Sequence, residues 1–352
     1  MSASHGRSEA ALSPHGGPAR SAELPLRWGI LSTSNLARRK VLPAMLRSKG
    51  VELVAVASRS LQAARDMAAE FGIARAWGSY EELIADPDVD VIYNPLPNHL
   101  HVPWTLAAAR AGKHVLCEKP MALDATELLA LREVCERVHL REAFMVEFHP
   151  QWIKLRELVA AGEIGEPTSA HVQFSYCNTD PANIRNQAGL GGGALYDIGC
   201  YAVFAGEWCF GAQPRRVVAS FDRDGAFKVD RHVAGMLDYG EGRSLGFSVS
   251  MQSARRQSLS LVGSRGSLCM PLPFNALPDV PCALELQGEA QDAPRRRIEL
   301  PAADQYGLQA EAFVRQIRGG PPGAACLEQA MARMRVLDAL RRSESSGRFE
   351  TP

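Results

Sequence analysis

The chain has 352 residues, more than one hydrophobic core usually holds, so its length predicts two domains. Lysine plus arginine equals aspartate plus glutamate, at 39 each, and the net charge is zero, so no field of one sign draws the chain to nucleic acid or to an anionic membrane. The composition, 46% hydrophobic and 22% charged, is that of an ordinary globular protein. We therefore expect a small-molecule partner and neither nucleic acid nor membrane.

Residues 1–24 are rich in Ser, Ala, Gly and Pro and contain no apolar run, so we expect a flexible tail rather than an export signal. The eight cysteines show no CxxC spacing, which favours free thiols in a reducing compartment, the cytoplasm. Their spacing does not favour zinc, and we predict no metal site.

Residues 25–146 alternate strands with helices joined by short connections, which predicts a parallel, doubly wound sheet of the Rossmann type. The expected strands are 27–32, 51–57, 89–94, 114–117 and 143–146. The expected helices are 35–47, 60–71, 80–85, 102–111 and 126–138. The fold class is therefore α/β, and this first domain would bind a dinucleotide.

Residues 147–352 have a different pattern, in which strand-like runs follow one another between turn signals, so we predict a second α/β domain with a large, mostly antiparallel open sheet. The expected strands are 170–176, 217–221, 233–239, 244–251, 258–262 and 267–270. The expected helices are 152–161, 194–210, 305–317 and 327–343.

The first strand-to-helix turn departs from the dinucleotide fingerprint G-x-G-x-x-G/A, because Ser32, Ser34 and Ala37 take the three small positions. Small residues still let backbone approach a pyrophosphate, and the N–H groups at the start of a helix bind anions. The alternative is an ordinary connection without a ligand. We predict that the turn binds cofactor through Ser32, Thr33, Ser34, Asn35 and Leu36.

The second strand ends in Ser58 and Arg59, with no carboxylate at 57–60. An acidic residue here is typical of NAD sites, whereas an arginine suits the 2′-phosphate of NADP. We therefore predict NADP, with NAD possible. The alternative is that Arg59 is only a solvated residue at the start of a helix.

The loop after the fourth strand contains two prolines and two histidines, at the place where the nicotinamide half of a dinucleotide would lie. We assign its residues to cofactor contacts rather than to a metal, because two histidines without a third clustered ligand are weak evidence. The predicted contacts are Pro95, Leu96, Asn98 and His101.

The run 114–120 reads as a short buried strand that ends in Glu118 and Lys119 and is stopped by Pro120. Ligands of parallel α/β sheets bind beyond the carboxyl ends of the strands, so Lys119 would lie at the mouth of a crevice. There an ammonium can orient a hydroxyl or carbonyl and tune proton transfer. The alternative is a surface lysine after an edge strand.

Three runs together resemble the Gfo/Idh/MocA family of oxidoreductases, named after glucose–fructose oxidoreductase, inositol dehydrogenase and a rhizopine-catabolism protein. They are residues 27–33 (RWGILST), 112–120 (GKHVLCEKP) and 191–201 (GGGALYDIGCY). The resemblance implies a Rossmann domain followed by an α/β domain with a large open sheet. It also implies NAD(P)-dependent oxidation or reduction of a sugar, polyol or related carbonyl compound. The second domain, 147–352, would then bind the substrate and, by analogy only, form a homodimer through the open face of its sheet.

The same resemblance makes Lys119, Asp197 and Tyr201 the candidate catalytic residues and adds Arg185 and Tyr306 as cofactor or substrate contacts. We also predict that Glu118 and Lys119 contact the cofactor. Asp197 and Tyr201 are four apart on a predicted helix and so share a face. We expect Tyr201 to donate or accept the proton, Lys119 to lower its pKa and anchor the substrate oxygen, and Asp197 to orient sugar hydroxyls. The roles of Tyr201 and Lys119 can be exchanged.

A tyrosine rather than a histidine at 201 makes the chain more similar to the dihydrodiol dehydrogenase, NADP-dependent xylose dehydrogenase and glucose–fructose oxidoreductase members. Glu147 departs from the arginine that relatives often carry, and we expect its charge to alter the substrate pocket or the environment of the cofactor. Two other functions stay open: a non-catalytic dinucleotide-binding sensor, and a reductase of trans-dihydrodiols or other small carbonyls.

Overall fold

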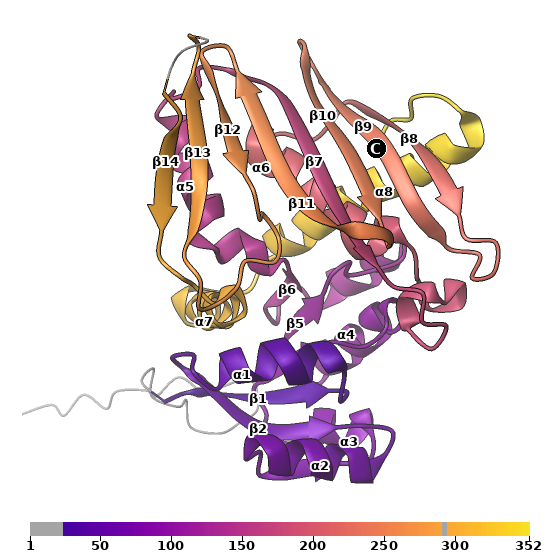
Figure 1. The fold of residues 1–352 in the computed structure, drawn as a ribbon. Coiled ribbons are helices and arrows are strands. Elements are labelled where there is room, and N and C mark those ends of the chain that lie inside the picture. The colour runs from indigo at the N-terminus through magenta and orange to yellow at the C-terminus, as the bar shows by residue number, and fades with distance from the viewer. Residues whose placement is uncertain (1–23, 291–293) are drawn as a thin grey trace, which may run out of the picture.

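Two β-sheets organise the part of the chain that the computed structural model describes, residues 24–290 and 294–352 (Figure 1). The tail predicted at residues 1–24 lies outside the described residues, except for Leu24. A smaller sheet near the N-terminus is wholly parallel, and a larger one that follows is almost wholly antiparallel. These two sheets confirm the predicted fold class.

The six strands of the first sheet lie in the order β3-β2-β1-β4-β5-β6. They are β1 (Leu26–Leu31), β2 (Val51–Ala57), β3 (Arg75–Trp77), β4 (Val91–Asn94), β5 (His114–Glu118) and β6 (Leu140–Ala143). Apolar runs fill them because strands covered by helices on both faces have no solvent-facing side. The order reverses between β1 and β4, which opens a crevice at their carboxyl ends.

The helices of this half follow the strands. They are α1 (Leu42–Met45), α2 (Leu61–Phe71), α3 (Tyr80–Ala85) and α4 (His101–Arg110). Shorter helical turns are η1 (Ala37–Val41), η2 (Asn98–Leu100), η3 (Glu127–Glu133) and η4 (Met145–Phe148). Ser79 caps α3 in a capping box with Glu82, and Gly72 ends α2 in the left-handed conformation, as the sequence chemistry favours.

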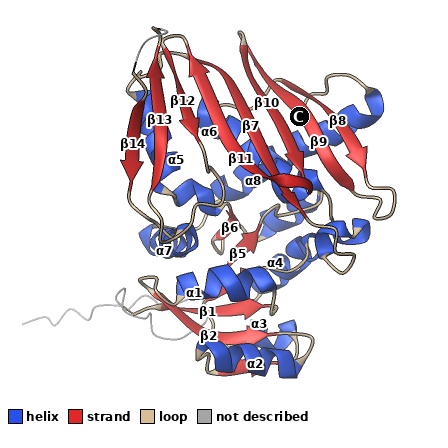
Figure 2. Cartoon of the chain, in the orientation of Figure 1, coloured by secondary structure: helices blue, strands red, loops and turns tan. Residues whose placement is uncertain are grey.

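The eight strands of the second sheet lie in the order β14-β13-β12-β11-β7-β10-β9-β8, and only the β7–β10 pair is parallel. They are β7 (Pro167–Cys177), β8 (Arg216–Arg223), β9 (Asp230–Gly240), β10 (Arg243–Ser250), β11 (Gln252–Gly263), β12 (Gly266–Met270), β13 (Cys282–Gly288) and β14 (Arg296–Leu300). One face carries helices, and no described helix covers the other (Figures 1 and 2).

The helices of this half are α5 (Pro150–Ala160), α6 (Cys200–Phe210), α7 (Gln305–Gly319) and α8 (Ala325–Ser346), with turns η5 (Ile184–Asn186), η6 (Ala188–Leu190) and η7 (Leu195–Gly199). Although α7 follows the large sheet in sequence, it packs on the first one: the rings of Trp28 and Phe313 lie 6.0 Å apart. The start of α7 is thereby placed beside the crevice.

Three strands, β3, β13 and β14, were not expected from the sequence, because they are short or partly exposed and lack a continuous apolar run. The strand expected at 143–146 is wrong: β6 ends at Ala143, and Met145–Phe148 form a helical turn. An apolar run this short does not distinguish strand from buried helix. The helix expected at 126–138 is instead a shorter 3-10 helix, in which Leu128 and Leu131 are buried.

Candidate active site

A cavity of about 770 Å³ opens along the carboxyl ends of β1, β2, β4 and β5, at the reversal of strand order. Its volume lies within the usual range for ligand sites. Twelve of the fifteen predicted cofactor residues line it: Ser32, Ser34, Asn35, Leu36, Arg59, Pro95, Leu96, Asn98, His101, Glu118, Lys119 and Arg185. The other three, Thr33, Ser58 and Tyr306, do not line this cavity.

In the turn after β1, one of the serines that replace the fingerprint glycines has a backbone conformation that glycine favours. Ser32 has φ 92°, a conformation that glycine adopts freely and serine adopts at a cost on the order of 1 kcal/mol. The Ser34 hydroxyl accepts a hydrogen bond from the Ala37 N–H at 3.2 Å, so its own proton is left to donate to a ligand. The residues of this turn therefore fit a phosphate group.

Arg59 follows β2, is exposed, and lines the same cavity. Burial raises the pKa of Tyr80, and the nearby Arg59 guanidinium offsets part of that rise, which places Arg59 close to the Tyr80 hydroxyl. Ser58 is buried instead, and its hydroxyl accepts from the Ser60 N–H at 3.3 Å where α2 begins. The turn after β2 therefore presents an arginine, and no carboxylate at 57–60, to the cavity.

His101, expected as a cofactor contact, has both ring nitrogens engaged. Nδ1 lies 2.7 Å from the Pro120 carbonyl oxygen, and Nε2 lies 2.7 Å from the Leu96 carbonyl oxygen. Burial lowers its pKa to about 4. The ring thus ties the loop after β4 to the loop after β5. Among the described residues, no group of three or more His, Cys, Asp or Glu side chains is arranged to hold a metal ion.

Lys119 lies at the centre of a charged cluster built from both halves of the chain. Its Nζ donates to the Asp197 carbonyl oxygen at 2.5 Å and lies 3.4 Å from the Asp197 carboxylate. That carboxylate also accepts from Arg185 Nε at 2.8 Å and from the Tyr176 hydroxyl at 2.5 Å. Asp197 therefore holds two cations and a phenol in one place.

The cluster fixes the charge of each member. Burial alone would raise the pKa of Asp197, but Arg185 and Lys119 outweigh it and hold that pKa well below its usual range. Burial alone would lower the pKa of Lys119, but Asp197 outweighs it and the pKa is raised. Near neutral pH, Lys119 is thus an ammonium and Asp197 a carboxylate.

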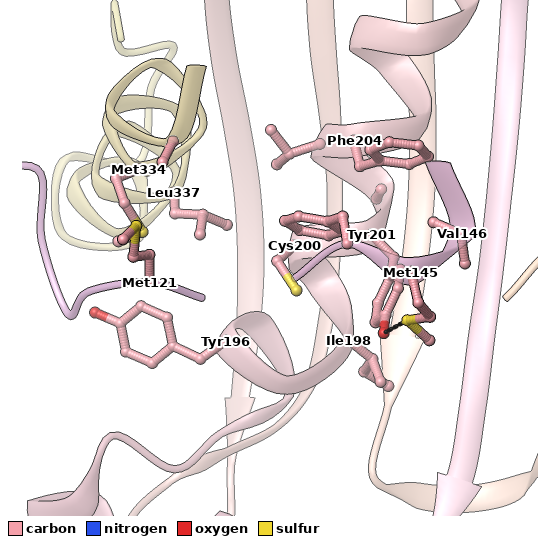
Figure 3. Packing of buried hydrophobic residues seen from close by; sticks show 14 of the residues in the cluster. Met121, Met145, Val146, Tyr196, Ile198, Cys200, Tyr201, Phe204, Met334 and Leu337 are labelled. Carbon is pink, nitrogen blue, oxygen red and sulfur yellow. Dashed lines mark hydrogen bonds between the residues drawn. The ribbon is translucent and has the colours of Figure 1, made fainter. Parts of the chain in front are cut away.

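Tyr201 lies directly beside Lys119, whose Nζ is 5.0 Å from the centre of the phenol ring. The ring is 4% exposed and packs against Phe144, Phe174 and Phe274 with centroids 5.1 to 5.7 Å away, so its orientation is fixed. Its hydroxyl donates to the Met145 thioether at 3.4 Å (Figure 3). A thioether is a weak acceptor, so the hydroxyl remains available to a ligand oxygen.

A second cavity, of about 310 Å³, joins these groups. Lys119, Asp197 and Tyr201 all line it, together with Met145, Tyr176 and Tyr306. It adjoins the large cavity, because Leu36, Glu118, Lys119, Asn183, Arg185 and Asp197 line both. The arrangement provides a fixed ammonium and a neutral phenol at the inner end of a dinucleotide-sized crevice.

Family models match both halves of the chain. The oxidoreductase family with an NAD-binding Rossmann fold matches residues 26–148, and the GFO/IDH/MocA C-terminal domain matches residues 152–269. The chain belongs to the Gfo/Idh/MocA family of oxidoreductases. The resemblance drawn from the three sequence runs is therefore confirmed.

Three relatives of this Gfo/Idh/MocA chain have named activities. A D-xylose 1-dehydrogenase (NADP⁺) of Haloferax volcanii is 36% identical, over 92% of this chain and 98% of the relative. A trans-1,2-dihydrobenzene-1,2-diol dehydrogenase of Mus musculus is 33% identical, over 77% of this chain and 80% of the relative. KijD10, a 3-ketoreductase from Actinomadura kijaniata, is 31% identical in sequence. Its crystal structure in complex with NADP and TDP-benzene matches this fold with a TM-score of 0.85, over 91% of this chain and 98% of that one.

Two expectations about this Gfo/Idh/MocA chain need correction. The pKa of Tyr201 is raised well above its ordinary value, chiefly by burial, rather than lowered by Lys119, because the ammonium lies over the ring face. Glu147 lines neither of the two cavities, since its carboxylate pairs with Arg141 Nη2 at 2.8 Å. Its charge is therefore neutralised away from the site.

Tyr306 was expected among the cofactor contacts and lies instead on the smaller cavity, beside Tyr201. Tyr176 and Met145 were not expected at all, although they contact Asp197 and Tyr201 directly. Tyr176 is the second-last residue of β7, and its place near the end of an expected strand is the one sequence signal that could have marked it. The catalytic and cofactor roles of all these residues stay predictions.

Proposed function

We propose that this protein is an NADP-dependent oxidoreductase that transfers hydride between nicotinamide and a CH–OH carbon of a sugar, a polyol or a related diol. The observation that carries the proposal is the Lys119 ammonium 5.0 Å from the centre of the Tyr201 ring, in a cavity that adjoins the large crevice. Bound nicotinamide would supply or accept the hydride. The chain must supply the hydrogen bonds and the proton.

In this proposal Tyr201 transfers the proton. Its raised pKa keeps the phenol protonated, so in the direction of reduction the hydroxyl gives its proton to the carbonyl oxygen as hydride arrives at carbon. In the direction of oxidation the same oxygen takes the proton from the substrate hydroxyl. Its raised pKa makes the phenolate scarce near neutral pH, so oxidation is favoured at alkaline pH.

Lys119 then acts as a fixed cation beside the reacting oxygen. Its raised pKa excludes it as a base near neutral pH, which supports the assignment of the proton transfer to Tyr201. An ammonium that is held in place stabilises negative charge as it develops on the substrate oxygen. Asp197 fixes its position through the contacts to Nζ, and Arg185 shares that carboxylate.

The cofactor assignment rests on the turns after β1 and β2. Ser32, Ser34 and Asn35 would hold the pyrophosphate and Arg59 the 2′-phosphate, since no carboxylate stands at 57–60 to repel it. The xylose dehydrogenase and the ketoreductase are also NADP proteins by name. NAD remains the alternative cofactor.

A panel of substrates with each cofactor tests the proposed function. The purified protein is incubated with aldoses, polyols and a trans-dihydrodiol, with NADP⁺ or NAD⁺, and reduced nicotinamide is followed at 340 nm. Turnover of a sugar or polyol with NADP⁺ supports the proposal. Turnover of the dihydrodiol alone favours the second candidate function, a dihydrodiol dehydrogenase. The mouse relative and the aromatic side chains of Phe174, Tyr176 and Tyr306 that line the smaller cavity favour that second function. Binding of NADP without any turnover would favour a sensor.

Replacing Arg59 by aspartate is expected to weaken NADP binding by 100-fold or more and NAD binding by less than about threefold. The change removes a guanidinium that binds phosphate and puts a like charge beside the 2′-phosphate. Titration of the intrinsic fluorescence with each dinucleotide measures both constants. Arg65→Asp, on the exposed surface of the following helix α2, is the matched control and should alter neither. Equal weakening of NADP and NAD by Arg59→Asp would refute the 2′-phosphate role.

We also propose a cytoplasmic homodimer. The second sheet has one face that no described helix covers, which offers a surface for a second copy (Figure 2). All eight cysteines are free, in keeping with a reducing compartment. No helix in the described part of the chain has the length and apolar character that a membrane crossing requires. Sedimentation equilibrium measures the oligomeric state.

A further inference from the structure

A third cavity, of about 310 Å³, lies where the helical turn η1 and the start of α7 meet the large sheet. Four cationic side chains from three parts of the chain line it. They are Arg39 and Lys40 in η1, Arg47 just after α1, and Arg255 in β11. Asp304 is the one acidic side chain among its lining residues. A concentration of four cations against one carboxylate is notable in a chain of zero net charge.

Most of this positive charge is not neutralised within the protein. Asp304 pairs with Arg47 Nη2 at 2.8 Å and also accepts from the Tyr306 N–H, where it caps α7. Among the described residues, none forms an ion pair with Arg39, Lys40 or Arg255. The cavity thus differs from the centre of the site, where Asp197 already pairs with Lys119 and Arg185.

The basic cavity is continuous with the catalytic one and separate from the large one. It shares Arg255, Asn275 and Tyr306 with the cavity that Lys119 and Tyr201 line. It shares no lining residue with the 770 Å³ cavity assigned to the dinucleotide. The three therefore follow one another, with the proposed site of proton transfer between the large cavity and the basic one. A cofactor phosphate cannot account for the charge.

We propose that the basic cavity binds a phosphate group carried by the substrate, so that the substrate is a phosphorylated or nucleotide-linked sugar rather than a free one. The proposal rests on the proposed function, since it places the reacting carbon between Tyr201 and the nicotinamide. Two guanidinium groups and an ammonium are the side-chain donors that commonly bind phosphate, and a guanidinium can pair with phosphate in bidentate fashion. The three side chains are exposed and form no ion pair within the described part of the chain, so a phosphate can reach them.

The catalytic test compares glucose, glucose 6-phosphate and UDP-glucose as substrates at saturating NADP⁺. The variant Arg39→Gln/Lys40→Gln/Arg255→Gln removes the charge from three exposed side chains, so it is expected to fold. We expect kcat/KM for at least one phosphorylated sugar to exceed that for glucose by 100-fold, and this ratio to fall about 100-fold in the variant, mainly through KM. The control Arg65→Gln/Arg335→Gln neutralises exposed arginines on α2 and α8 that line none of the three cavities, and should keep the ratio.

A binding test separates this proposal from the proposed function. Inorganic pyrophosphate is titrated by calorimetry into the protein saturated with NADP⁺, which occupies the other phosphate sites. Pyrophosphate binding that is lost in the triple variant and kept in the control supports the basic cavity as an anion site. If this result is obtained while no sugar is turned over, only the oxidoreductase proposal fails. Turnover of free glucose as efficient as that of both phosphorylated sugars, or pyrophosphate binding unchanged in the triple variant, would overturn the inference. A preference for glucose 6-phosphate or for UDP-glucose identifies the source of the phosphate.

Discussion

Tyr201→Phe is expected to lower kcat by 100-fold to 10,000-fold, because it removes the one hydroxyl that the proposal assigns to proton transfer. Stability is expected to change little, since the hydroxyl bonds only to the Met145 thioether and the phenyl ring keeps its aromatic neighbours. Steady-state kinetics with the best substrate of the panel measures kcat, and thermal unfolding checks the fold.

The matched control for Tyr201→Phe is Tyr239→Phe. Tyr239 is also buried, its hydroxyl has no hydrogen-bond partner among the described residues, and it lines none of the three cavities. It should keep the wild-type kcat. An unchanged kcat in both variants would remove Tyr201 from the mechanism.

The pH profile gives the same assignment a second test. Burial raises the pKa of Tyr201, and the protonated phenol is the form that donates in the direction of reduction. The active form therefore persists as the pH rises past the ordinary tyrosine pKa near 10, and reduction should show no loss from this group below that pH. The pKa of Lys119 is also raised, so its ammonium persists over the same range.

The convergence of Lys119 and Tyr201 could be predicted from the sequence because each residue has a local signal. Lys119 ends a buried strand of a parallel sheet, where ligands bind, and Tyr201 belongs to a run that resembles the family. The raised pKa of Tyr201 could not be predicted, because it depends on burial among Phe144, Phe174 and Phe274, which come from separate elements.

The side chains that contact Asp197, and the existence of the basic cavity, could not be predicted from the sequence either. Tyr176 and Arg185 lie 21 and 12 residues before Asp197, on the strand β7 and in the helical turn η5, and no spacing rule connects them to it. Arg39 and Arg255 lie more than two hundred residues apart in the sequence. They line the same cavity in the folded chain, in which α7 packs on the first sheet. Charge that is balanced over the whole chain is unevenly distributed in space.

Lys119→Met is expected to lower kcat by 100-fold to 1,000-fold, the usual cost of losing one positioned donor to a developing negative charge. The carboxylate of Asp197 keeps Arg185 and Tyr176 as partners, so the site should hold its shape. The pKa of Asp197 should rise, because burial raises it and the variant removes one of the two cations that lower it. Single-turnover kinetics separates the chemical step from substrate binding.

Lys113→Met is the control for the loss of a buried lysine. Lys113 is 5% exposed, and its Nζ donates to the carbonyl oxygens of Asp86 and Val89, away from the three cavities. It should lower the unfolding temperature and leave kcat unchanged, because it frees two buried acceptors without touching the site. Lys119 lines both the large and the catalytic cavity, so the dissociation constant of NADP is measured for each variant. A Lys119→Met protein that binds NADP weakly but keeps kcat at saturation would make Lys119 a cofactor anchor, and the cation beside the reacting oxygen would have to be Arg185.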